Sequence, residues 1–120
     1  MKKVIAVVAI LLGFALNANA QEVKTVSLEQ TKGEFTQKKI TLKEGTYIFE
    51  IANKNVGHDV GFVLTEKGKL EAEYHIKEAY VTSLVKNNAK STTKEVVLKK
   101  GEYVYFCPLN PTPQYTLTVE

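Results

Sequence analysis

The chain has 120 residues, a formal net charge of +3 at pH 7 and a single cysteine, Cys107, which excludes an internal disulfide framework. All of its basic residues are lysines scattered along the sequence, so no arginine is present for bidentate contacts to phosphates or base edges. Nucleic acid is therefore not an expected partner.

The first 20 residues have the pattern of a secretory signal peptide. Lys2 and Lys3 precede an apolar run from Val4 to Leu16, and Ala18-Asn19-Ala20 has the small-x-small form of a cleavage site. The apolar run is too short for a convincing membrane span. We therefore predict a signal peptide over residues 1–20, export to the periplasm or the medium, and a soluble domain over residues 21–120 with a net charge of about +1.

Residues 21–120 alternate between polar and apolar side chains over most of their length, which is typical of strands. In the third predicted strand, Tyr47, Phe49 and Ile51 share one face. Gly57 and Gly61 predict a bulge or a close backbone approach in the fourth. The predicted strands are residues 23–28, 39–42, 46–52, 56–64, 95–98, 102–107 and 115–120.

The apolar period changes between Leu70 and Asn88, where a stripe at helical spacing predicts one helix. Its members are Ala72, Ile76, Ala79, Tyr80 and Leu84. Short strands with one such excursion predict an all-β fold, a Greek-key antiparallel β-sandwich.

Few side chains offer chemistry beyond Cys107, His58 and His75. A nucleophilic Cys107 with a histidine base lacks an oxyanion-hole motif and a helix start at the thiol. Glu71 and Glu73 are typical of a solvated helix start, and the sequence contains no Gly-rich phosphate loop, CxxC or HExxH. We expect that the protein is not an enzyme.

Two segments resemble the cupredoxins, the plastocyanin- and azurin-like blue copper proteins. In the first, GTYIFEIANKNVGHDVGFVL, a strand ending in asparagine precedes a histidine, His58. In the second, VVLKKGEYVYFCPLNPTPQYTLTVE, a Gly-x-Tyr-x-Tyr-Phe-Cys strand delivers Cys107. The resemblance implies a cupredoxin-like fold for residues 21–120, copper as cofactor, and His58 and Cys107 as metal ligands.

The ligand loop departs from the family pattern because no histidine follows Cys107. Asn110 stands where the nearest second histidine is expected, and Gln114 is placed to be a weak axial donor. His75 is the other histidine available to complete a site. The predicted metal residues are therefore His58, Cys107, Asn110 and Gln114.

Three functions remain open at this stage. The first is copper binding with electron transfer, in which a redox or copper-trafficking protein is the partner. The second is a metal-free interaction module, in which Cys107 is a buried hydrophobe and His58 is hydrogen-bonded by Asn53, Asn55 or Asp59. The third is a thiol role for an exposed Cys107 in dimerisation or redox sensing.

Overall fold

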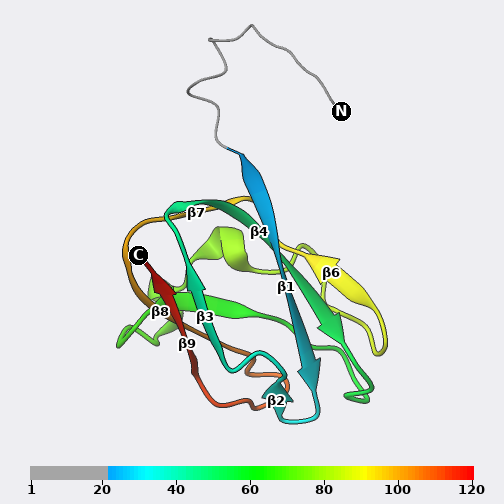
Figure 1. Ribbon diagram of the computed structural model, residues 1–120. Coiled ribbons are helices and arrows are strands. Elements are labelled where there is room, and N and C mark those ends of the chain that lie inside the picture. Colours follow the sequence, from blue (N-terminus) through cyan, green and yellow to red (C-terminus); the bar gives the residue numbers. More distant parts are fainter. Residues whose placement is uncertain (1–21) are drawn as a thin grey trace, which may run out of the picture.

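The computed structural model describes residues 22–120, so the predicted signal peptide over residues 1–20 lies outside the described residues. Two β-sheets pack face to face (Figure 1). One sheet has the order β2 (Glu34–Phe35), β1 (Val23–Thr31), β4 (Gly45–Asn53) and β6 (Lys90–Thr92), and β7 (Val96–Leu98) also pairs with β4. The other has the order β3 (Lys39–Leu42), β9 (Tyr115–Val119), β8 (Gly101–Phe106) and β5 (Val63–Glu66).

The β-sandwich prediction is confirmed, but the sheets are mixed rather than antiparallel. β1 runs parallel to β4, and β3 runs parallel to β9. This arises because β1 and β3, which are separated in the chain only by the short strand β2, lie in different sheets, where each joins a strand that is not its hairpin partner.

Alternation along β4 builds the core as predicted, because Tyr47, Phe49 and Ile51 are buried on one face. The face continues to Asn53, which is only 1% exposed at the end of the strand. On β1, Leu28 and Gln30 are buried in the same alternation. Two neighbouring parallel strands therefore end in buried amide side chains, and Gln30 is the register partner of Asn53.

The predicted helix over residues 70–88 is wrong. The segment contains only two 3₁₀ turns, η2 (Ala72–Tyr74) and η3 (Lys77–Ala79). Outside these turns its backbone bonds to other parts of the chain: the Ile76 N–H donates to the Leu64 carbonyl at 2.9 Å, and Val85 exchanges two hydrogen bonds with Val60. Within residues 22–120, no helix has the length and apolar character needed to cross a bilayer.

The fourth predicted strand, residues 56–64, is regular only from Val63, where β5 begins. Before it, Asn55 has φ 55° and Gly57 has φ 103°, so the chain turns sharply. The irregular backbone predicted from the glycines is therefore present. It lets the loop over residues 54–62 fold across the ends of β1 and β4, where Lys54 N–H bonds to the Gln30 carbonyl.

Aromatic rings fill the core beside the β1–β2 turn. Phe35 is fully buried, and its ring meets those of Tyr105, Tyr115 and Phe62 edge-on at 5.1, 5.7 and 6.1 Å between centroids. Edge-to-face pairs of this kind add to the free energy of burial. The two-residue strand β2 is therefore anchored mainly by one side chain.

Replacing Phe35 with alanine should lower the free energy of unfolding by about 3–5 kcal/mol, because it removes a buried ring and its three aromatic neighbours. Urea unfolding followed by tyrosine fluorescence measures this. Val97→Ala is the control, since Val97 is 63% exposed. Equal losses in the two variants would contradict the assignment of Phe35 to the core.

Burial, and then the neighbouring Tyr115 phenol, raises the pKa of Tyr105 to about 12. An unfolded tyrosine has a pKa of about 10, so the folded state keeps this proton longer, and its contribution to stability is lost as pH rises from about 10 towards 12. Urea midpoints measured across this range should fall more steeply for the wild type than for Tyr105→Phe. Tyr74→Phe, which changes an exposed ring, should follow the wild type.

Candidate functional site

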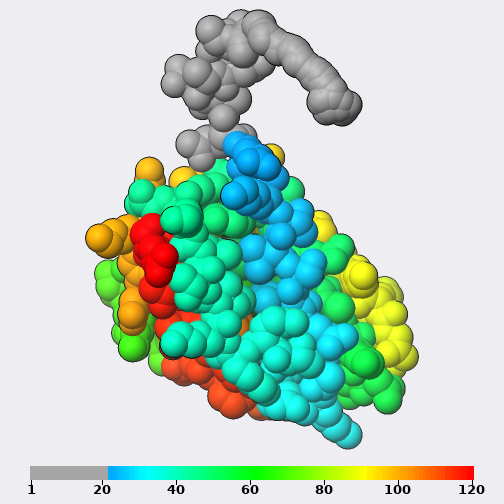
Figure 2. Space-filling model, in the orientation of Figure 1, coloured from blue at the N-terminus to red at the C-terminus, as the bar shows by residue number. Residues whose placement is uncertain are grey.

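The candidate site lies at one end of the sandwich, which we call the loop end. It is made of the β1–β2 turn, the loop over residues 54–62 and the loop over residues 107–114, together with the strand ends beside them. In Figure 2 the turn, coloured cyan, lies beside the orange-red segment that leads into β9. A hydrogen bond from the Gly33 N–H to Asn110 Oδ1 joins these two segments across 77 positions of sequence.

Cys107 continues the inward face of β8 by one residue beyond the strand and is fully buried. Its thiol lies within the hydrophobic core cluster. The backbone N–H of Gly61 donates to Sγ, with 3.3 Å between nitrogen and sulfur. The Cys107 N–H donates to the Thr112 hydroxyl oxygen at 3.0 Å, so the loop turns back on the cysteine.

His58 lies three residues before Gly61, on the same loop, and its side chain is exposed. Nδ1 lies 2.9 Å from the carbonyl oxygen of Asp59. The His58 carbonyl accepts a hydrogen bond from Asn53 Nδ2 at 2.8 Å. The buried Asn53 amide therefore anchors the backbone at His58, and the His58 residue is exposed at the surface.

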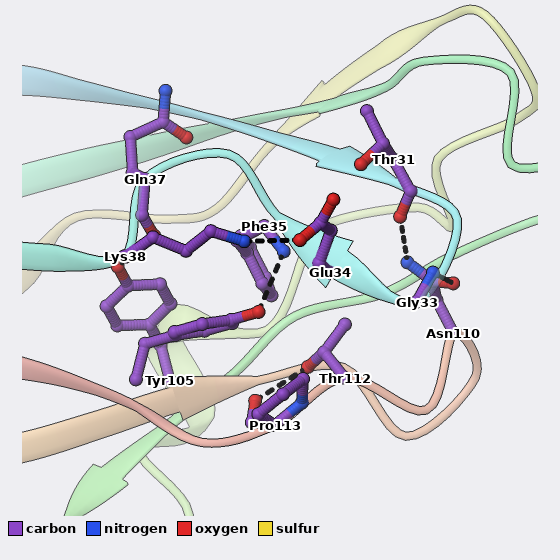
Figure 3. A network of polar contacts seen from close by, with 11 residues as sticks. Thr31, Gly33, Glu34, Phe35, Gln37, Lys38, Tyr105, Asn110, Thr112 and Pro113 are labelled. Carbon is purple, nitrogen blue, oxygen red and sulfur yellow. Dashed lines mark hydrogen bonds and ion pairs between the residues drawn. The ribbon is translucent and has the colours of Figure 1, made fainter.

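Asn110 is 2% exposed, and its whole amide is engaged. Nδ2 donates to Gln30 Oε1 at 3.0 Å and to the Thr31 carbonyl at 2.8 Å. Oδ1 accepts the Gly33 N–H at 2.7 Å. Figure 3 shows Asn110 reaching from its loop to Thr31 and Gly33. Asn110 as a copper ligand stays a prediction, and it would require the side chain to leave these partners.

The remaining predicted donors lie in different surroundings. Gln114 is exposed in the loop before β9. His75 lies between the two 3₁₀ turns, where Nδ1 is 2.8 Å from the Tyr80 hydroxyl and Nε2 is 2.9 Å from the Leu70 carbonyl. Both nitrogens of His75 are therefore occupied by neighbours of its own segment.

Asn53 and Gln30 were missed as site residues. Asn53 Nδ2 also bonds to the Val85 carbonyl at 3.1 Å, and Oδ1 accepts the Val56 N–H at 3.1 Å. Gln30 Nε2 donates to the Gly61 carbonyl at 2.7 Å. The available signal was their position, since each is an amide at an inward position of an alternating apolar strand.

The family of the chain follows from comparison with known proteins. A model of the cupredoxin-like domain matches residues 4–119. The chain belongs to the cupredoxin-like domain family. No curated protein matches it.

Solved cupredoxin structures share this fold. Auracyanin A, a "blue" copper protein of the green thermophilic photosynthetic bacterium Chloroflexus aurantiacus, superposes with a TM-score of 0.67 at 13% identity, covering 82% of this chain and all of that one. Auracyanin B gives 0.62 at 17% identity, covering 81% and 88%. Amicyanin of Paracoccus versutus gives 0.52 at 16% identity, covering 80% and 81%.

The donors of this cupredoxin domain do not make a blue copper centre, which takes two imidazoles and one thiolate. Residues 22–120 contain no group of three or more His, Cys, Asp or Glu side chains placed to hold one metal ion. In the same residues, no buried side-chain nitrogen or oxygen lacks a hydrogen-bond partner. Cys107 and His58 are residues of the types that bind copper in proteins, and a soft thiolate ligand would select Cu(I).

Replacing Asn53 with alanine should lower the free energy of unfolding by about 1–3 kcal/mol, because the His58 carbonyl and the Val56 N–H lose their partner and the Val85 carbonyl loses one of its two donors. Thermal unfolding of the purified variant measures the loss. Lys54→Ala is the control, because Lys54 is the residue that follows Asn53 and is exposed. A wild-type melting temperature for Asn53→Ala would show that the loop does not depend on this amide.

Proposed function

We propose that this protein is an exported copper-binding cupredoxin that holds Cu(I) through Cys107 and His58. The observation that carries the proposal is the Gly61 N–H directed at Cys107 Sγ, because this contact places the loop that carries His58 directly against the sulfur. Export rests on the sequence pattern of residues 1–20. Family membership supports copper as the metal.

A bound copper ion would supply a one-electron redox couple at the loop end. The chain's own contribution is a buried sulfur, an imidazole at the surface and a fold that keeps both loops in place. Because one thiolate and one imidazole suit Cu(I) better than Cu(II), we propose a copper-trafficking protein, rather than an electron-transfer protein, as the partner. Gln114 is the exposed amide available as a weak third donor.

An anaerobic Cu(I) titration against a chromogenic chelator tests the proposal. The wild-type protein should retain about one equivalent, Cys107→Ser should retain none, and His58→Ala should bind at least about tenfold more weakly. His75→Gln is the matched control and should bind as the wild type does, because the His75 ring is engaged elsewhere.

Copper that is lost from the wild type on desalting would refute copper binding. Equal effects of His58→Ala and His75→Gln would refute His58 as a ligand while leaving Cys107 in place. An intense thiolate-to-copper(II) band is not expected from this donor set, since the second imidazole is missing.

A metal-free interaction module is the second candidate function. The observation that favours it is the hydrogen bonding of the Gln30, Asn53 and Asn110 amides to other protein groups. Within residues 22–120, every buried side-chain nitrogen and oxygen already has a hydrogen-bond partner in the protein. For this function, partner binding would be unaffected by a copper chelator and by Cys107→Ser. Loss of the partner under either treatment would favour copper instead.

A further inference from the structure

A continuous series of hydrogen bonds runs from the thiol to the β1–β2 turn. Gly61 donates its N–H to Cys107 Sγ and accepts from Gln30 Nε2 through its carbonyl. Gln30 in turn accepts from Asn110, whose Oδ1 is bonded by the Gly33 N–H. We call Gln30 and Asn110 the amide pair. It ties the loop over residues 107–114 to β1 and, through Gly61, to the loop over residues 54–62.

The peptide of Gly61 contacts the thiol, and two leucine side chains lie beside Gly61. A methyl group placed on the Gly61 Cα would lie 3.7 Å from Leu84 Cδ2 and 3.9 Å from Leu109 Cδ1. Leu84 is 51% exposed and Leu109 is 49% exposed, so each side chain lies near Gly61 and is also partly exposed to solvent. Leu109 precedes Asn110, and its position therefore depends on the bonds of the amide pair.

We propose that the amide pair is a gate over Cys107, and that Asn110 is a gate residue and not a copper ligand. Sγ becomes accessible to a copper ion or a thiol reagent only when Asn110 separates from Gln30 and the segment carrying Leu109 lifts from Gly61. The inference goes beyond copper binding, because the closed arrangement is complete without a metal.

The chemistry of the pair explains why an asparagine suits position 110. Its amide provides two donors for two oxygens, those of Gln30 and Thr31, and one acceptor for the Gly33 N–H. An aspartate has nearly the same shape, but as a carboxylate it faces two oxygens with no proton to donate. Asn110→Asp therefore breaks the gate specifically while keeping the size of the side chain.

The rate at which Cys107 reacts with a small neutral disulfide reagent tests the gate in metal-free protein, with chelator present throughout. The wild type should react far more slowly than the urea-unfolded chain, and Asn110→Asp should react at least about tenfold faster than the wild type. Gln114→Ala is the matched control, since it removes the exposed amide of the same loop, and it should stay within about twofold of the wild type.

If Asn110→Asp does not fold, the urea dependence of the wild-type Cys107 reaction rate provides a second test of the gate. Opening of the gate exposes little surface, so the rate should be nearly constant at low urea and rise only as global unfolding begins. A rate that rises steeply from the lowest urea concentration would overturn the gate. So would equal rates for folded wild type and folded Asn110→Asp. Neither outcome depends on copper, so failure of the gate is distinguishable from failure of copper binding.

Discussion

The bond between Asn110 and Gln30 is the contact on which the loop end depends. Each amide is buried, and a buried amide without a partner costs more free energy than a hydrogen bond contributes. Gln30 is fixed by the pairing of β1 with β4, so the loop carrying Asn110 has to lie against the end of β1 for these two side chains to bond to each other. The turn at Gly33 and the loop at Gly61 are then held to the same two amides.

In this cupredoxin-like fold, the loops at the loop end are held together by hydrogen bonds of buried side-chain amides. In a blue centre, the metal joins the ligand loops through two imidazoles and a thiolate. Here the amides of Gln30, Asn53 and Asn110 join the loops at this end of the sandwich. The two proposals are compatible, because a buried thiol behind a gate suits a protein that holds Cu(I) and releases it to a partner.

The sequence was sufficient for the sandwich and for the family, because the alternation in β4 and the strand β8 that leads to Cys107 are local patterns. It failed for residues 70–88, where helical spacing was present but strand β5 supplied the backbone partner of Ile76 and the loop over residues 54–62 supplied that of Val85. It also failed for Gln30, whose role depends on Asn110, 80 positions away. Such a contact is determined by the pairing of sheets and has no signature in a local pattern.

Hydrogen exchange of the side-chain amides in the metal-free protein tests the central claim most directly. NMR resolves the carboxamide protons of Asn110 and Gln30, with those of exposed Gln114 as an internal reference. The account predicts that the Asn110 and Gln30 protons exchange at least about a hundredfold more slowly than those of Gln114, because they open only with the loop. Exchange of Asn110 at the rate of Gln114 would show that the amide pair is open in solution, and the account would be wrong.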